Sequence, residues 1–148
     1  IAVRRAHLLV CRAVIPPAVL GQPLPLDDDS DDDVLQSTES RVLRGIGASP
    51  GSYRGRARVI EALTDASTLI EGDVLVCRNT TPPWTPFFGI IGALVTNSGG
   101  SLSHASVVAR EFGLPAVVGT VHATAMIGDG DTLTVDGTNG VVIIETGP

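Results

Sequence analysis

Lysine is absent from this 148-residue chain, and all ten of its positively charged residues are arginines. The chain therefore cannot use a Schiff-base lysine or a P-loop lysine, which excludes the mechanisms that need either group. Sixteen acidic residues outweigh the arginines and give a net charge of −6 with an isoelectric point near 4.8. Because nucleic-acid binding needs a basic footprint, we expect no nucleic-acid partner.

Aromatic residues, cysteines and long apolar runs are scarce as well. The chain is 43% hydrophobic but only 3% aromatic, so a packed core has to be built from Val, Ile, Leu and Ala. Cys11 and Cys77 have no metal-type spacing, and two isolated cysteines are typical of reduced thiols in a cytoplasmic protein. Pro, Gly or charge interrupts every apolar run before the roughly 18 residues that span a membrane. We expect a cytoplasmic protein without a membrane partner.

The first 40 residues differ in composition from the rest. Residues 1–14 are expected to be the end of a preceding domain or a tail, and because the chain starts at Ile1 we expect a piece of a longer protein. Residues 15–40 are rich in proline and hold six aspartates between positions 27 and 33. These carboxylates repel one another, which predicts an acidic, solvated linker. A calcium loop is the alternative, but its pattern needs Gly and Glu where Asp32 and Thr38 stand.

Residues 41–148 predict a compact, mixed α/β domain of short elements separated by Gly- and Pro-containing turns. We expect strands at 41–46, 53–60, 73–77, 90–96, 116–118, 132–136 and 141–145. Short helical segments are expected near 64–67 and 123–127. The segment 80–88 is either a packed loop or a short helix that begins at Pro86.

One further helix is predicted together with both of its ends. Ser103 is a good N-cap, and residues 105–112 contain neither Gly nor Pro. Gly113 suits the left-handed position that ends a helix, and Pro115 prevents its continuation. His104 then lies in the first turn, where unpaired N–H groups and the helix dipole favour an anion such as a phosphoryl group.

His104 is therefore a candidate nucleophile. Imidazole is largely uncharged and nucleophilic at neutral pH, and the helix dipole helps to hold a phosphoryl group once it is attached. Gly99 and Gly100 let backbone N–H groups approach that group, and the hydroxyls of Ser101 and Ser103 can donate to it or cap the helix. The residues alone leave an alternative open, in which His104 merely starts a helix and the glycines form a tight turn.

Arg110 and possible metal ligands complete the candidate residues. Six residues of helix place Arg110 about 9 Å along the axis and roughly 240° around from His104, so it does not clamp the same phosphate. We expect Arg110 to pair with a carboxylate or to contact a partner domain. No metal-ligand cluster is visible in the sequence, so no metal is expected in this chain.

The sequence GGSLSHASVVARE at 99–111, followed by GLPAVVG at 113–119, resembles the phosphohistidine signature of phosphoenolpyruvate-utilising enzymes. This family includes phosphoenolpyruvate synthase, pyruvate phosphate dikinase, enzyme I of the sugar phosphotransferase system and rifampicin phosphotransferase. The resemblance extends over about residues 41–146, because residues 47–57 are similar to the entry of the family's domain and residues 129–140 to its closing hairpin.

The resemblance implies a three-layer β/β/α swivelling domain in which His104 carries a phosphoryl group between two sites. Nucleotide-binding and phosphoenolpyruvate or substrate domains of a longer enzyme would supply these sites, with Mg²⁺ bound beside ATP or phosphoenolpyruvate there and no cofactor bound in this chain. Residues 15–40 would then be the swivel linker, and the chain would be a phosphotransferase fragment that is inactive alone.

The chain departs from some members of the family at one position. Where those members carry a threonine two residues before the histidine, a regulatory phosphorylation site in plant dikinases, this chain has Leu102. That form of control is therefore excluded, and the segment is more similar to the synthase and rifampicin phosphotransferase branches. Two alternatives stay open: the same carrier role with an antibiotic or aromatic acceptor, and a non-catalytic regulatory or interaction domain.

Overall fold

The computed structural model describes residues 40–145. The predicted tail at 1–14 and nearly all of the predicted linker at 15–40 lie outside the described residues. Within 40–145 the chain forms eight strands, two α-helices and two 3-10 helices. They are β1 (Ser40–Arg44), β2 (Ile46–Ser49), β3 (Ser52–Ile60), η1 (Leu63–Thr68), β4 (Val74–Cys77), η2 (Pro82–Gly89), β5 (Ala93–Thr96), α2 (His104–Phe112), β6 (Ala116–Val118), α3 (Ala123–Met126), β7 (Thr132–Asp136) and β8 (Val141–Glu145).

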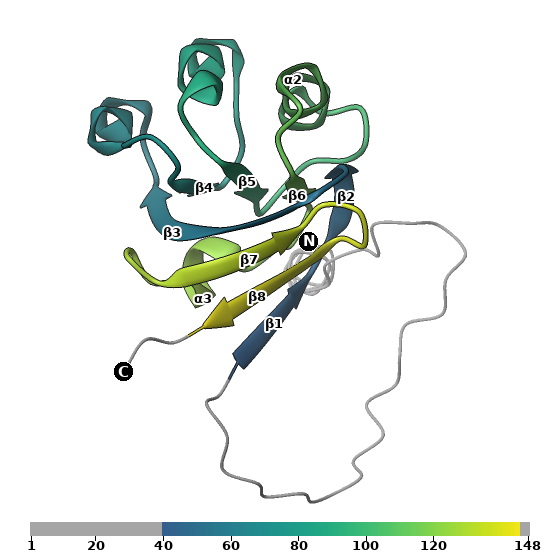
Figure 1. Ribbon diagram of the computed structural model, residues 1–148. Coiled ribbons are helices and arrows are strands. Elements are labelled where there is room, and N and C mark those ends of the chain that lie inside the picture. The colour runs from purple at the N-terminus through teal and green to yellow at the C-terminus, as the bar shows by residue number, and fades with distance from the viewer. Residues whose placement is uncertain (1–39, 146–148) are drawn as a thin grey trace, which may run out of the picture. The chain divides into compact units, whose positions relative to one another are not determined.

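The eight strands lie in the order β1-β8-β7-β3-β4-β5-β6-β2 (Figure 1). The long strand β3 joins two halves, because residues 52–56 pair antiparallel with β7 and residues 57–60 pair parallel with β4. The edge strands β1 and β2 are consecutive in the chain and only Gly45 separates them. A Cβ at Gly45 would lie 2.5 Å from the carbonyl oxygen of Val118, so a side chain does not fit this corner. The sheet thereby folds back on itself into two facing layers.

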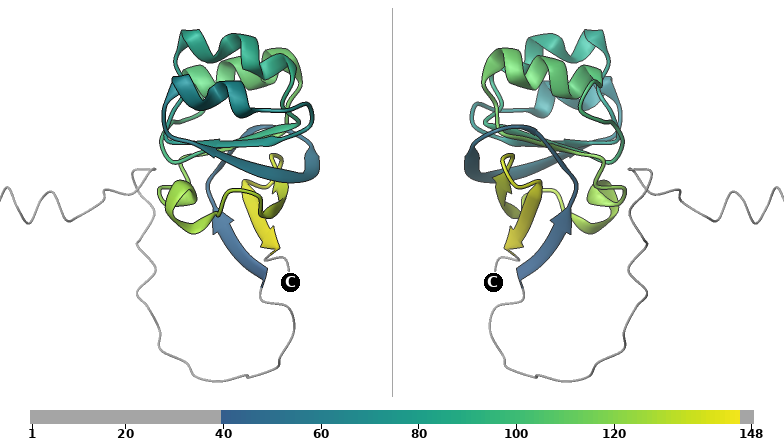
Figure 2. Two further views of the ribbon diagram at one scale, coloured as in Figure 1. Left: turned by 90° about the vertical axis from the view of Figure 1, so that its left-hand side faces the viewer. Right: turned by 90° about the vertical axis from the view of Figure 1, so that its right-hand side faces the viewer.

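Strand periodicity separates two hydrophobic cores. Successive side chains of a strand point to opposite faces. In β4, Val74 and Val76 lie in the core between the two sheet layers, whereas Leu75 and Cys77 face the helices. The helices η1, η2 and α2 cover the outer face of β3 to β6, while α3 packs against the core between the sheet layers (Figure 2). The expected mixed α/β fold with β/β/α layers is confirmed.

Most of the predicted elements are present, and the differences have local causes. The strand expected at 41–46 is divided between β1 and β2, because the chain changes sheet layer at Gly45. The segment 80–88 forms η2, which begins at Pro82 rather than Pro86. The strand expected from residue 90 begins at Ala93, because Ile90 is still hydrogen-bonded to the last turn of η2.

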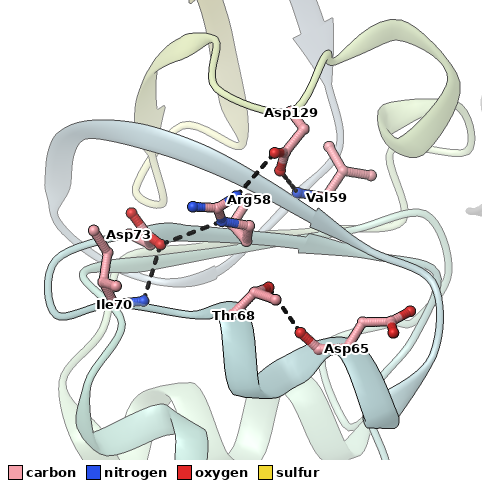
Figure 3. A network of polar contacts seen from close by, with 7 residues as sticks. All are labelled: Arg58, Val59, Asp65, Thr68, Ile70, Asp73 and Asp129. Atoms are coloured by element: carbon pink, nitrogen blue, oxygen red, sulfur yellow. Dashed lines mark hydrogen bonds and ion pairs between the residues drawn. The ribbon is translucent and has the colours of Figure 1, made fainter.

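An ion-pair network, buried at Asp73 and half exposed at Asp129, ties β3 to the turns on either side of it (Figure 3). Nη1 of Arg58 donates to Asp129 at 2.9 Å, and Nε of the same residue lies 3.6 Å from the carboxylate of Asp73. Asp73 also accepts a hydrogen bond from the N–H of Ile70 at 3.1 Å. This network lies at the amino end of β4, where its arginine and its carboxylates are paired with one another within the fold.

Across 40–145, no helix has both the length and the apolar character that a membrane span requires.

Candidate functional site

The helix α2 begins at His104 with the predicted caps at both ends. Ser103 has extended backbone angles and its Oγ accepts a hydrogen bond from the N–H of Ser106 at 3.4 Å. Gly113 has φ +66, and its N–H bonds to the last turn of the helix. His104 therefore occupies the first helical position, where the backbone N–H groups have no intrahelical acceptor and the dipole is positive.

Three loops meet at this end of the sheet. The strands β4, β5 and β6 are parallel neighbours, so their carboxyl ends share one edge. Residues 78–81 follow β4, the glycine loop at 97–103 follows β5, and residues 119–122 follow β6. Such an edge is a common place for ligand binding in sheets with parallel strands.

Thr80 holds the ring of His104. Its Oγ1 lies 3.1 Å from Nδ1 of His104, and its side chain is only 7% exposed. The ring of Phe88 packs edge-on against the imidazole, with centroids 6.3 Å apart and planes at 89°. Among the described residues Nε2 of His104 has no hydrogen-bond partner. The imidazole is thus fixed through one nitrogen, and the other nitrogen is left for chemistry.

Sequence reasoning missed Thr80. It lies 24 residues before His104 in a proline-containing loop, and no spacing rule connects the two. The only available signal was that the two residues lie in the segments that follow neighbouring strands, whose carboxyl ends must meet if the strands are parallel.

The glycine loop has one glycine that the fold requires and one that it does not. Gly99 has φ +124, and a Cβ there would lie 2.9 Å from Oγ of Ser103. A Cβ at Gly100 would meet no atom within 4 Å. The carbonyl of Gly100 accepts hydrogen bonds from the N–H of Ser103 at 3.0 Å and from Oγ of the buried Ser106 at 2.6 Å. The loop is therefore fixed against the helix, with open space beside Gly100.

The remaining predicted site residues have different surroundings. Ser101 is exposed, and its carbonyl accepts a hydrogen bond from Nη2 of Arg110. Of our two expectations for Arg110, pairing with a carboxylate is not found within the described residues, because its guanidinium binds the glycine loop instead; contact with a partner domain stays a prediction. The hydroxyl of Ser103 caps the helix and lies 3.1 Å from Oγ of Ser106.

A strained turn lies against the start of the glycine loop. Val121 has φ +69, a rare conformation for a β-branched residue. The N–H of His122 donates to the carbonyl of Thr120 at 2.8 Å, which closes a γ-turn around Val121. The N–H of Val121 donates to the carbonyl of Asn97 at 2.9 Å. Sequence reasoning gave no sign of this turn, because valine is unfavourable at positive φ.

Metal and thiol chemistry have no support at this edge. No group of three or more His, Cys, Asp or Glu residues within 40–145 is arranged to hold a metal ion. Cys77, at the end of β4, is a free thiol as expected, and burial raises its pKa to about 12. It is therefore protonated and unreactive at neutral pH. Cys11 lies outside the described residues.

Comparison with known proteins connects this geometry to a family. Residues 69–140 match the family described as "PEP-utilising enzyme, mobile domain", and they include Thr80, the glycine loop and His104. The chain carries a mobile domain of the PEP-utilising enzyme family. The recognition made from the signature at 99–119 is thereby confirmed.

Two relatives show where such mobile domains occur. The chain is 48% identical over 102 residues to a phosphoenolpyruvate synthase of Aeropyrum pernix, covering 68% of the chain and 12% of the relative. It is 46% identical over 107 residues to a rifampicin phosphotransferase of Bacillus cereus, covering 72% of the chain and 12% of the relative. Among the curated relatives, the chain spans only 4% to 16% of their length.

A solved structure supports the fold of the mobile domain. Aconitase X of Thermococcus kodakaraensis in its holo form matches 70% of the chain and 98% of its own matched chain, with a TM-score of 0.55 and 17% identity. At this identity the similarity concerns the arrangement of the strands and helices and not the chemistry.

Proposed function

We propose that this mobile domain is the phosphoryl carrier of a phosphotransferase, and that His104 is the residue that is phosphorylated. The observation that supports this most directly is the contact of Thr80 with Nδ1 at 3.1 Å. It leaves Nε2 as the nucleophilic nitrogen, in a ring that the first turn of α2 presents beside a glycine loop. A non-catalytic regulatory domain would have no need for a histidine held in this way.

The transfer requires a defined proton on the imidazole. Nδ1 carries the proton and donates it in a hydrogen bond to Oγ1 of Thr80, so the lone pair of Nε2 is free. Nε2 attacks phosphorus in line, the N–P bond forms, and the P–O bond to the leaving group breaks with its electron pair going to the leaving oxygen. In the second half-reaction an acceptor oxygen attacks the phosphorus, and the electron pair of the N–P bond returns to Nε2.

Backbone N–H groups position the phosphoryl oxygens in this proposal. The N–H groups of Gly99, Gly100 and Ser101 have no backbone hydrogen-bond partner within the described part of the chain. The N–H of Ser103 is occupied by Gly100, so Ser103 acts through its hydroxyl and the helix cap. The positive end of the α2 dipole adds to the binding of the dianion.

The donor and acceptor sites belong to other parts of a longer protein. The curated relatives are many times longer than the chain, which leaves room for nucleotide-binding and phosphoenolpyruvate or substrate domains. In this proposal those domains hold ATP or phosphoenolpyruvate with Mg²⁺, and residues 15–40 form the linker that lets the carrier move. The chain alone loads and unloads nothing from these donors.

Two acceptor classes fit the relatives. The similarity to a phosphoenolpyruvate synthase favours pyruvate as the partner of the phosphoryl group. The similarity to a rifampicin phosphotransferase favours an antibiotic or another hydroxyl-bearing acceptor, with the same carrier chemistry at His104. The carrier role is common to both.

Labelling of the full-length protein tests the carrier role. Phosphoenolpyruvate or ATP labelled at the β-phosphate should transfer an acid-labile, base-stable label to the wild type, and His104→Ala should lose it completely. Val42→Ser, at a half-exposed position of β1 on the opposite side of the domain from α2 (Figure 1), is a control that should keep the label. Equal labelling of His104→Ala would refute the assignment of the carrier.

A further inference from the structure

Ser106 carries a buried hydroxyl that bonds to the glycine loop. The residue has no exposed surface, and its Oγ donates a hydrogen bond of 2.6 Å to the carbonyl oxygen of Gly100. Each helical residue is turned by about 100° from the one before, so Ser106 lies roughly 200° around α2 from His104. The hydroxyl therefore does not share the side of the imidazole, and any effect on a group carried by His104 has to pass through the loop.

Two donors converge on one carbonyl in the most open part of this loop. Glycine is the most flexible residue, and a Cβ at Gly100 would meet no atom within 4 Å, so neither sterics nor packing fixes the backbone there. The carbonyl of Gly100 nevertheless accepts both the N–H of Ser103 at 3.0 Å and the hydroxyl of Ser106. The two bonds together fix the plane of the peptide that joins Gly100 to Ser101.

The hydroxyls of Ser103 and Ser106 form a chain that runs in one direction. A hydroxyl has one proton and a carbonyl can only accept, so the proton of Ser106 is used on Gly100. The hydroxyl of Ser103 lies 3.1 Å from Oγ of Ser106 and is then the donor in that contact. Hydrogen bonds in such a chain polarise one another, and this chain ends on the carbonyl of Gly100.

We propose that Ser106 is a positioning residue for the phosphoryl group, and that it acts through the peptide between Gly100 and Ser101. No described peptide bond is cis, so the N–H of Ser101 points away from the carbonyl that the two donors hold. This N–H has no backbone acceptor within residues 40–145. Polarising the carbonyl strengthens the N–H of the same amide as a donor, here to a phosphoryl oxygen on Nε2. The inference rests on the carrier role of His104 proposed above.

Nuclear magnetic resonance of the phosphorylated chain tests this role. Phosphoramidate is used to load the wild type, Ser106→Ala and Ser106→Cys, whose thiol has nearly the shape of the hydroxyl but is a weak donor. On loading, the amide proton of Ser101 should move downfield in the wild type and clearly less in Ser106→Ala. Hydrogen bonds to the dianion lower the pKa of the phosphoryl group, so this pKa should be higher in Ser106→Ala by about 0.5. Loading should be about threefold slower, and Ser106→Cys should lie between the two proteins.

Val135→Ala is the control for a general loss of stability. It removes buried methyl groups from β7, in the core between the two sheet layers, and should lower the unfolding temperature about as much as Ser106→Ala does. The amide shift of Ser101, the pKa of the phosphoryl group and the loading rate should all stay at their wild-type values in Val135→Ala.

Three results would overturn the positioning role. One is a wild-type amide shift and phosphoryl pKa in Ser106→Ala, and another is an equal change of both in Val135→Ala. The third is a wild type in which loading leaves the amide proton of Ser101 where it was. None of these results affects the carrier role, which fails only if His104→Ala is labelled.

Discussion

Replacing Thr80 with valine should slow phosphorylation of His104 without unfolding the domain. Valine has nearly the shape of threonine and fits a position that is 7% exposed, but it cannot accept the proton of Nδ1. Attack by Nε2 makes the imidazole cationic, so the hydrogen bond at 3.1 Å becomes one to a charged group. Such bonds contribute about 1.5–3 kcal/mol, against about 0.5–1.5 kcal/mol for the neutral bond before attack. The rate depends on the difference of about 1–1.5 kcal/mol, which corresponds to a rate loss of roughly 5- to 13-fold.

The assay uses the chain itself with phosphoramidate as the donor, so that no partner domain is needed. Phosphorus NMR follows the appearance of phosphohistidine, and nitrogen-15 labelling identifies the ring nitrogen that is phosphorylated. The wild type should form the Nε2 adduct. Thr80→Ser keeps the hydroxyl and should retain most of the wild-type rate of phosphorylation. If Thr80 acted only through the packing of its methyl group, Thr80→Ser would be slower than Thr80→Val.

A clear result would refute the reasoning about the ring. If Thr80→Val forms the Nε2 adduct at the wild-type rate, the hydroxyl does not control the imidazole. If the wild type forms the Nδ1 adduct, the contact with Thr80 breaks during the reaction and the proposed protonation state is wrong. Thermal unfolding of both variants serves as the control for the fold.

Three further predictions follow from the surroundings of the loop and the core. Gly99→Ala should lower the unfolding temperature because of its φ of +124, whereas Gly100→Ala should unfold like the wild type yet accept phosphoryl groups more slowly; equal stability of the two variants would contradict this. Ser106→Ala removes the 2.6 Å bond to the loop and should destabilise the domain by about 1–3 kcal/mol in a denaturant titration. Burial raises the pKa of the Cys77 thiol from 9.0 to about 12. The contribution of this thiol to the free energy of unfolding is therefore intact below pH 9, and it falls between pH 9 and 12 by up to about 1.4 kcal/mol per pH unit. The free energy of unfolding of Cys77→Ala should fall less steeply with pH over that range than that of the wild type. Identical slopes of the two proteins would contradict the burial of the thiol.

The helix that carries His104 could be predicted from the sequence because its signals are local. Ser103, Gly113 and Pro115 mark its ends through the conformations they prefer, and these preferences do not depend on the rest of the fold. The near-continuous apolar run of β4 likewise indicated a buried strand. Local chemistry therefore gave the position of the nucleophile and most of the elements around it.

The partners of His104 could not be predicted in the same way. Thr80 and Phe88 reach the imidazole only because η2 and the loop before it pack against α2, and this packing depends on the order of the strands. The division of residues 41–46 into β1 and β2 was also hidden, since a single glycine changes the sheet layer there. Contacts between distant segments follow from topology, and topology is not a local property of the sequence.

The pairing of the first described strand with the last has a mechanical consequence. Ser40 lies opposite Glu145 in the ladder of β1 and β8, so the described domain begins and ends at one point. In Figure 1 this point lies on the opposite side of the domain from α2. A longer chain that continues from both ends would hold the domain as a lever with its joint at this corner and His104 on the far arm. A small rotation at the joint would move the imidazole through a long arc, and no strand of the domain would have to bend.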